Sequence, residues 1–218
     1  MAISRALIPQ RTSHVESSTV MVPTLTTRRL ILRPLELSDA AQAQLLFPQW
    51  EIVRYLAKGV PWPYPPDGAY TYYRDVALPA MESGEAWHWN LRLRTNPEQM
   101  IGSIALLKHD KVNRGFWLGL PWHRRGLMSE AADAVTDYWF EALKFPVLRV
   151  PKAVANTGSR RISEKQGMRV IAREEQDYVS GRFPAEIWEI TAAEWRAHKS
   201  SGRVAISAEE TRADKDWS

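Results

Sequence analysis

The 218-residue sequence contains no cysteine. This absence excludes disulfide bonds, thiolate metal ligands and a cysteine nucleophile. No apolar run approaches the ~18 residues that a membrane-spanning helix needs, and the first residues lack the apolar core of a signal peptide. We therefore expect a cytoplasmic protein that makes no use of a membrane. The glycine-rich nucleotide loops GxxxxGK(S/T) and GxGxxG are absent as well.

The composition is that of a globular chain with a mild basic excess. The sequence is 44% hydrophobic, carries a formal net charge of +4 and has a pI near 9.4. We expect one domain over residues 24–199, with flexible segments at 1–23 and 200–218. The charge suits anionic ligands, although it is too small to require nucleic acid. Ten tryptophans are compatible with aromatic pocket walls or with an ordinary core.

The order of the expected elements is typical of a mixed α/β fold. Asp39 and Asp67 are placed to cap helices, while Asn96-Pro97 and Ser180-Gly181 are turn signals. A proline within a strand favours a sheet edge or an opening in the sheet, and Pro151 is such a residue. Strands are expected at 29–34, 86–94, 100–108, 115–120, 147–154, 168–172 and 185–191, and helices at 39–47, 69–82, 127–143 and 156–166.

Residues 113–143 combine an aromatic strand, a turn and an amphipathic helix. The turn holds Arg124, Arg125 and Gly126 directly before the helix. The N-terminus of a helix offers unpaired N–H groups and the positive end of its dipole, so a glycine turn leading into it can bind phosphate. The segment therefore predicts a phosphate site, although an exposed Arg-Arg-Gly turn without a ligand has the same pattern.

Two motifs resemble those of a known family. WHRRGLMSEA, residues 122–131, resembles the acetyl-coenzyme A turn of the GCN5-related N-acetyltransferases (GNAT), and NTGSRRISEKQGM, residues 156–168, resembles their second signature. The segments RRLILRPL, VPWPYP, MIGSIAL and DYVSG also resemble the RimJ and RimL subgroup of ribosomal-protein acetyltransferases. The resemblance covers roughly residues 25–195.

The resemblance implies a single GNAT-type α/β (α+β) domain. Its mixed, mostly antiparallel and twisted sheet would have helices on both faces and would splay open between its fourth and fifth strands, here residues 115–120 and 147–154. Dimers are common in the family. A homodimer contact is therefore possible, and exposed aromatic residues near Trp188 and Trp195 are candidates for it.

The resemblance further implies acetyl-coenzyme A (acetyl-CoA) as co-substrate and no metal. A backbone N–H near Leu118 would meet the thioester carbonyl, and Asn156 would touch the pantetheine arm. His123 and Met128 depart from the family turn, but the turn binds pyrophosphate mainly through backbone N–H groups, so Met128 fits if its side chain enters the core. The N–H groups of Arg124, Arg125, Gly126, Leu127 and Met128 would bind the pyrophosphate, Ser129 would add its hydroxyl, and His123 is a further cofactor-binding residue of the turn.

The same resemblance suggests catalytic residues. Ser159 would give a proton to the departing thiolate, and Asp177 would act as the base, with Glu186 and His88 as competitors. More ordinary roles remain open, because Asn156 suits a helix N-cap, a helix-surface serine is usually inert, and a histidine between tryptophans is often structural. The absence of cysteine favours direct attack by the amine in a ternary complex over a covalent intermediate.

The sequence therefore predicts an N-acetyltransferase. The acceptor is either a protein N-terminal α-amine or a small amine, and the sequence does not separate the two. A non-catalytic nucleic-acid-binding module remains the alternative from another class, since aromatic residues lie among basic ones. That alternative requires basic residues along one face, whereas acidic residues are interspersed nearly evenly here.

Overall fold

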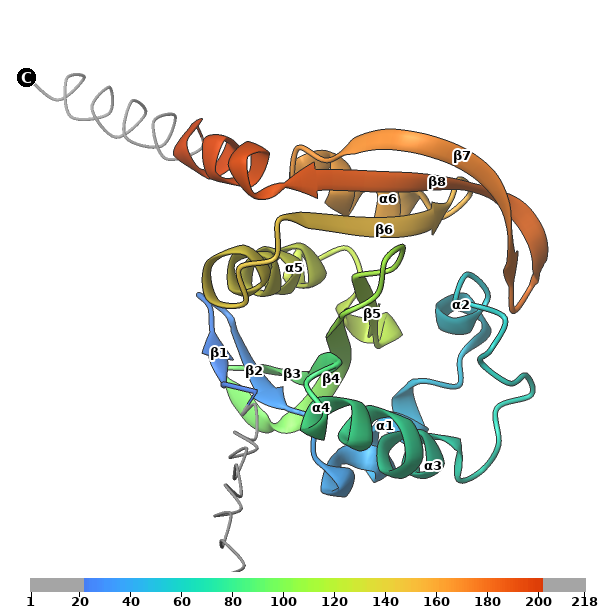
Figure 1. Ribbon diagram of the computed structural model, residues 1–218. Helices are drawn as coiled ribbons and strands as arrows, with labels where there is room; N and C mark the ends of the chain where they lie inside the picture. Colours follow the sequence, from blue (N-terminus) through green and yellow to red (C-terminus); the bar gives the residue numbers. More distant parts are fainter. Residues whose placement is uncertain (1–21, 202–218) are drawn as a thin grey trace, which may run out of the picture.

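The computed structural model describes residues 22–201, in which the strands form two sheets (Figure 1). The larger sheet has the order β1-β2-β3-β4-β5, and the smaller one has the order β6-β8-β7. Every pairing between neighbouring strands within the two sheets is antiparallel. The strands are β1 (Leu25–Thr26), β2 (Leu30–Pro34), β3 (Ala86–Leu93), β4 (Asn96–Leu107), β5 (Arg114–Leu118), β6 (Val147–Ala153), β7 (Arg169–Tyr178) and β8 (Gly181–Thr191).

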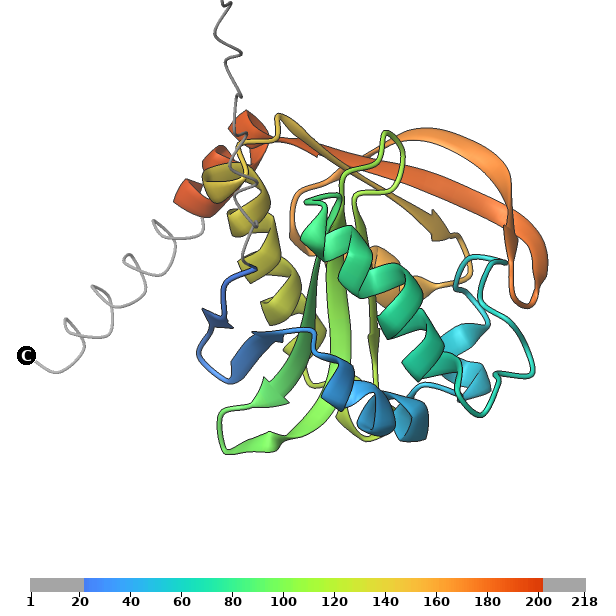
Figure 2. The same cartoon turned by 60° about the horizontal axis from the view of Figure 1, so that its bottom comes forward.

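Helices cover both faces of the larger sheet (Figure 2). One face is covered by α1 and the α3–α4 segment and the other by α5, and α6 packs beside α5. A π-helical turn lies between α3 and α4, a second one ends the helix that begins with α5, and residues 192–201 form a further helix. The helices are η1 (Leu37–Asp39), α1 (Ala40–Leu46), α2 (Trp50–Val53), α3 (Gly68–Tyr72), η2 (Tyr73–Ala77), α4 (Leu78–Glu82), η3 (Leu120–Trp122), α5 (Leu127–Asp137), η4 (Tyr138–Ala142) and α6 (Thr157–Lys165).

The central strands are buried because both faces are covered. Seven of the eight residues of β3 are buried, including its polar ones, which explains why its sequence shows no simple alternation. Most of the tryptophans belong to this core, as the second of the two interpretations predicted. Trp87, Trp89 and Trp122 are buried there, whereas Trp50 and Trp62 are exposed.

Four expectations from the sequence are corrected. The turn between β3 and β4 lies at residues 94–95, and Asn96 already belongs to β4. The last two strands are longer than expected and form one hairpin, which does turn before Gly181. Asp67 makes no side-chain capping bond. Trp188 and Trp195 are buried in the core, so they offer no surface for a dimer.

Asp39 is a fifth correction, because its side chain does not cap a helix. Its side chain makes no capping bond. Instead, one oxygen accepts a hydrogen bond from Asn90 Nδ2 at 2.9 Å, and the other forms a buried ion pair with Arg92. The attraction between two charges held away from water prevailed over the local capping preference.

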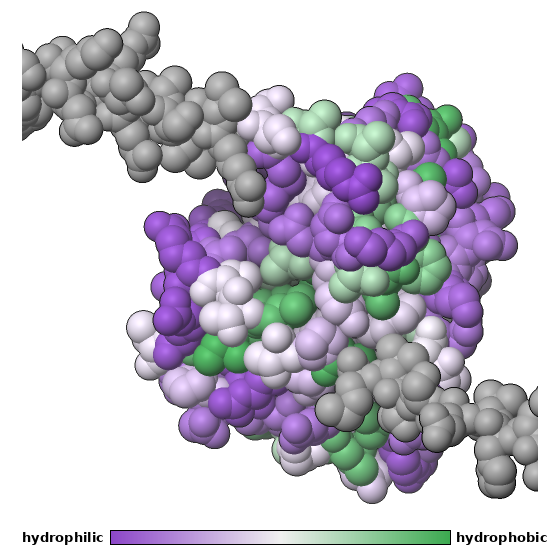
Figure 3. Space-filling model, turned by 60° about the vertical axis from the view of Figure 1, so that its left-hand side comes forward, coloured by the Kyte–Doolittle hydropathy of each residue, from purple (hydrophilic) through white to green (hydrophobic). Residues whose placement is uncertain are grey.

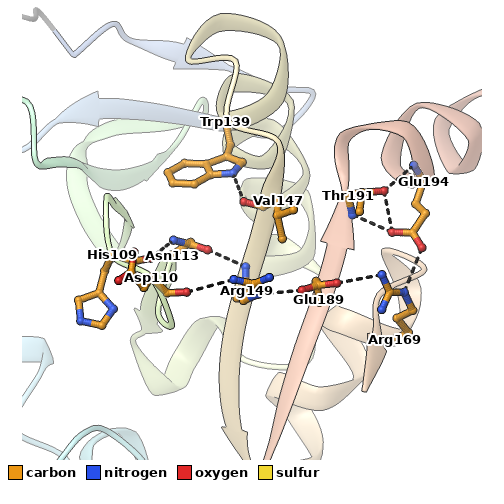
Figure 4. Close-up of polar contacts among 10 residues, drawn as sticks. All are labelled: His109, Asp110, Asn113, Trp139, Val147, Arg149, Arg169, Glu189, Thr191 and Glu194. Atoms are coloured by element: carbon orange, nitrogen blue, oxygen red, sulfur yellow. Dashed lines mark hydrogen bonds and ion pairs between the residues drawn. The ribbon is translucent and has the colours of Figure 1, made fainter. Parts of the chain in front are cut away.

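The two sheets separate between β5 and β6, as the sequence predicted. At one end, Asn113 N donates to Arg149 O at 2.8 Å and Arg149 N donates to Asn113 Oδ1 at 2.7 Å (Figure 4). Further along, Lys152 Nζ lies 5.1 Å from the centre of the Phe116 ring. The numbering rises together on both strands, so they run parallel. No ladder joins them. They are the fifth and sixth strands here because the short β1 precedes them.

Pro151 occupies the open side of β6. Val154 N donates to Pro184 O at 2.9 Å, so the even-numbered residues of β6 carry the hydrogen bonds to β8, with which Pro151 keeps its register. The missing N–H of Pro151 would have pointed toward β5. The proline therefore marks an edge, as predicted, but it does not interrupt the ladder with β8.

No helix in residues 22–201 is long and apolar enough to cross a membrane. On the face shown in Figure 3, hydrophobic residues form separated patches among hydrophilic ones. Such scattered patches are normal for protein surfaces.

We predict that Asp39→Ala lowers the free energy of unfolding by about 3–5 kcal/mol, because it leaves the Arg92 guanidinium buried without its partner. Denaturant unfolding measures this change. Asp75→Ala is the control: Asp75 pairs with Arg74 at 2.5 Å, but both side chains are about half exposed, so its effect on the free energy of unfolding should be much smaller. Equal losses in the two variants would contradict the prediction.

Candidate functional site

The turn before α5 has an unusual backbone. Arg124 has φ 57° and Gly126 has φ 72°, and Arg125 between them is not in the left-handed region. A residue other than glycine rarely adopts a positive φ and does so mostly at functional sites. Alternating left- and right-handed residues point successive N–H groups toward one point, where they can surround an anion.

Six successive N–H groups of this turn have no protein acceptor. Among residues 22–201, no hydrogen bond is donated by the backbone N–H groups from Arg124 to Ser129, whereas Glu130 N already donates to Gly126 O at 3.1 Å. These are the orphan donors of a helix start together with those of the turn. Leu127 and Met128 turn their side chains into the core, which meets the condition under which Met128 fits the turn and leaves their N–H groups accessible to an anion.

An ion pair from the other end of the domain holds the turn in place. Arg29 Nε lies 2.6 Å from Glu130 Oε2, and Arg29 Nη1 donates to Arg125 O at 2.9 Å. Thr27 Oγ1 also donates to Glu130 Oε1 at 2.6 Å. The conformation of the turn is therefore fixed before any ligand binds.

His123 contacts the strand end and not the anion seat. Its Nε2 lies 2.8 Å from Leu118 O, so the ring occupies the carbonyl at the end of β5. The arginines that follow, Arg124 and Arg125, are exposed and free to approach a phosphate. His123 thus positions the strand–turn junction, and its predicted direct contact with the cofactor stays a prediction.

The backbone of β5 turns two N–H groups toward the opening. Gly119 N donates to Ile101 O at 2.8 Å, so the odd-numbered residues of β5 bond to β4. In an antiparallel pair the alternate residues face away. The N–H groups of Phe116 and Leu118 therefore point toward β6, where the strands have separated. Leu118 is thus placed as the sequence predicted for a backbone donor.

The second signature lies on the opposite wall of the opening. Asn156 is the N-cap of α6, and its Oδ1 accepts a hydrogen bond from Ser159 N at 3.2 Å. Ser159 is half-buried, and its Oγ lies 2.7 Å from Lys152 Nζ. The structure therefore brings Asn156 and Ser159 together. The N-cap role of Asn156 is confirmed, and a contact with a ligand is compatible with it.

Lys152 is the residue that the sequence reasoning missed. It is 5% exposed, and burial, followed by the positive charge of Arg114, holds the pKa of its amine well below the usual range. A signal existed in the alternation of β6, where Leu148 and Val150 occupy the same buried face. A lysine at the next inward position is unusual in a core.

A cavity of about 360 Å³ lies on the face of the larger sheet toward which the side chains of the odd-numbered residues of β5 point. This size is within the range of small-molecule sites. Burial lowers the pKa of His88 to about 4, so its ring is neutral at pH 7. The cavity is mostly aromatic and apolar, and its lining includes Phe47, Val60, Pro61, Tyr64, Tyr72, Tyr73, His88, Gly115, Phe116 and Trp117.

The three candidate bases occupy different surroundings. His88 lines the 360 Å³ cavity. Asp177 lines a second cavity between the loop near Pro61 and the β7–β8 hairpin, and no contact joins it to Ser159 within residues 22–201. Glu186 is buried and binds Arg160 at 2.9 Å and Arg173 at 3.3 Å, so its carboxylate is already occupied.

This fold, with a pocket of backbone donors beside a split between two parallel strands, defines an acyl-CoA-binding class of transferase. A family model described as an acetyltransferase (GNAT) domain matches residues 29–169. The chain belongs to this family and is an acetyl-CoA-dependent acetyltransferase.

Individual relatives agree with this assignment. The probable N-acetyltransferase YjcK of Bacillus subtilis (strain 168) is 24% identical over 156 residues, which are 64% of this chain and 80% of that protein. Mycobacterium smegmatis RimJ in complex with CoA-disulfide superposes with a TM-score of 0.68 at 17% identity, covering 86% of this chain and 97% of that one. RimL, a ribosomal L7/L12 α-N-protein acetyltransferase in complex with coenzyme A, gives 0.65 at 15% identity, covering 78% and 97%. The predicted GNAT fold is confirmed.

The residues of the site fit acetyl-CoA. Six free N–H groups and two exposed arginines suit its pyrophosphate, and the N–H groups of Phe116 and Leu118 suit the amide and thioester oxygens of its arm. Among residues 22–201, no group of His, Asp or Glu side chains is placed to hold a metal ion.

We predict that Gly126→Val weakens acetyl-CoA binding at least about tenfold, because a β-branched residue strains at φ 72° and the N–H groups would turn away from the phosphate. Isothermal titration measures the affinity. Gly167→Val is the matched control, since Gly167 has φ 70° and follows the C-terminal end of α6, away from the turn. It introduces similar strain but should leave the affinity within about twofold of wild type. Equal weakening in both variants would argue against the phosphate turn.

Proposed function

We propose that the protein transfers acetyl from acetyl-CoA to the primary amine of a small molecule by direct attack in a ternary complex. The cavity against β5 carries this proposal. It is lined by Gly115, Phe116 and Trp117 of β5, and the N–H of Phe116 points from the same strand toward the split, so an amine in the cavity and a thioester in the split would both lie beside β5.

The residues of the chain divide the work between them. The turn from Arg124 to Ser129 binds the pyrophosphate. The N–H of Leu118 polarises the thioester carbonyl, since a donor aimed at developing oxyanion charge stabilises the transition state. Ser159 supplies a proton to the departing sulfur. With no cysteine to carry the acetyl group, attack without a covalent intermediate needs the fewest groups.

The acceptor follows from the lining of the cavity. Tyr64, Tyr72, Tyr73 and Trp117 supply aromatic surface, which suits an amine that carries an aromatic or apolar group. A neutral His88 can accept a hydrogen bond from the amine. The cavity's volume of about 360 Å³ favours a small amine over a protein N-terminus, which would need an open groove for the following residues.

The base is proposed separately. Asp177 is the predicted base, and the loop residues Val60 and Pro61 line both its cavity and the acceptor cavity. A shift of this loop would bring the two spaces together. Asp177→Asn should then lower kcat and shift the acid limb of the pH profile, whereas an unchanged profile would remove Asp177 from the mechanism.

A Gly115→Phe variant tests the acceptor site. Gly115 lines the cavity, and a Cβ built there meets no atom within 4 Å, so the ring would fill the space without forcing the backbone. We expect KM for a small aromatic amine such as 2-phenylethylamine to rise at least about tenfold, because the acceptor loses its volume. KM for acetyl-CoA should stay within about twofold.

A panel of small amines and N-terminal peptides, assayed by release of free coenzyme A, identifies the class of acceptor. Turnover of peptides alone would contradict the proposal of a small amine. A shift of Tm with acetyl-CoA tests the enzyme itself, since a ligand that binds only the folded state stabilises it by about 2.7 kcal/mol at 100 times its Kd. No shift would overturn the proposed function as a whole.

A further inference from the structure

We infer that Lys152 acts through Ser159 as a positioning residue of this enzyme, which holds the Ser159 hydroxyl and replaces the proton that Ser159 gives to the departing thiolate. This inference rests on the proposed function and extends it to a residue on the wall of the split.

The geometry places the amine directly behind the serine. Lys152 Nζ lies 2.7 Å from Ser159 Oγ, and Ser159 itself is half-buried at the start of α6. Asn156, the N-cap, holds the Ser159 backbone N–H. The hydroxyl oxygen therefore accepts from the lysine, and among residues 22–201 its own O–H donates to no other group.

The surroundings of Lys152 contain no carboxylate partner. Its register partner on β8, Glu186, is engaged by Arg160 from α6 and by Arg173 from β7. The group facing it from β5 is another buried cation, Arg114, whose pKa burial lowers to about 10. Phe116 offers only its ring face, 5.1 Å from Nζ.

From α5, the nearest acidic group is directed elsewhere. Asp133 accepts a hydrogen bond from Gln166 at 2.9 Å, and its charge acts on Arg114. A buried lysine without a partner is costly to keep as a purely structural residue, since a hydrocarbon side chain of the same length would fill the space. A loss of stability of this kind is kept in proteins when the residue is needed for activity.

Two proton transfers connect Lys152, Ser159 and the departing sulfur. As the thioester C–S bond breaks, the Ser159 Oγ–H bond breaks and an S–H bond forms. A Nζ–H bond of Lys152 then breaks and the Oγ–H bond forms again. Lys152 is left as a neutral amine and regains its proton from water, while the proton lost by the acceptor nitrogen leaves through the base.

The chemistry favours a lysine in this setting. An ordinary lysine has a pKa of about 10.4 and a thiol one of about 8.5, so proton transfer between them in water is uphill. Burial that lowers the pKa of Lys152 makes its ammonium a stronger acid and brings its pKa closer to that of the thiol. A general acid is most effective when its pKa is near that of its partner.

The decisive variant is Lys152→Met, which keeps the length of the side chain and removes its charge. We expect kcat with 2-phenylethylamine, or with the best acceptor of the panel, to fall roughly 100-fold or more, and KM for acetyl-CoA to change less than about threefold. At the same time Tm should rise by at least about 2 °C, because an unpaired buried charge is removed.

The combination separates chemistry from structure. A merely structural lysine would lose stability on replacement, so a lower Tm with a loss of activity in proportion would overturn the inference. The double variant Ser159→Ala with Lys152→Met should be no slower than the slower of the two single variants, since both substitutions interrupt the same relay. Lys165→Met, at the exposed end of α6, is the control and should leave kcat and Tm unchanged.

Two readouts do not depend on turnover. Titration of lysines labelled at Cε and followed by NMR should show one resonance, missing in Lys152→Met, with a midpoint below the usual 10.4 or so. An ordinary midpoint overturns the inference even if the enzyme is active. Intact mass after incubation with acetyl-CoA should show no adduct, because acetyl found on Ser159 would make the pair a nucleophile and its base.

The pH profile gives the sign of the effect. Only the ammonium form can supply the proton, so kcat of the wild-type enzyme should fall as pH rises through the pKa of Lys152, at a pH below about 10.4. This alkaline limb should be absent in Lys152→Met. A limb that persists in the variant belongs to another group and contradicts the assignment.

Discussion

The separation of β5 from β6 is the constraint on which the rest of the molecule depends. Two hydrogen bonds between Asn113 and Arg149 join the sheets at one end, and Arg149 is held in turn by Glu189 at 2.7 Å (Figure 4). Beyond this joint each strand keeps its ladder on one side only. The free backbone groups of the other side become the lining of the site.

The two ends of the split are stabilised by different means. At the joint, charges are paired and partly exposed. At the turn before α5, the Arg29–Glu130 pair fixes a backbone whose N–H groups stay free. Between them, the fold buries the amine of Lys152 beside Ser159 and without a carboxylate partner. The fold therefore loses some stability at a position where a reacting group would lie, as is common at active sites.

Much of the fold could be predicted because its signals are local or contiguous. The turn from Arg124 to Gly126, the N-cap Asn156 and the edge strand with Pro151 each depend on a few neighbouring residues. Asp39 could not be predicted, because Arg92, the residue that binds it, is 53 positions away. The same reason hid Lys152, whose meaning depends on Ser159 in the next helix and on what other strands leave unpaired.

Pro151 has a consequence for how the split stays open. Two parallel strands that lie side by side with free donors and acceptors can form a hydrogen-bonded ladder, which would close the site. On the β5 side of β6, Pro151 offers no N–H, so a ladder with Phe116 or Leu118 would lack a rung at the centre. The proline thus removes one donor from the edge of β6 that faces β5, and an opening that a ligand would otherwise have to create is built into the fold.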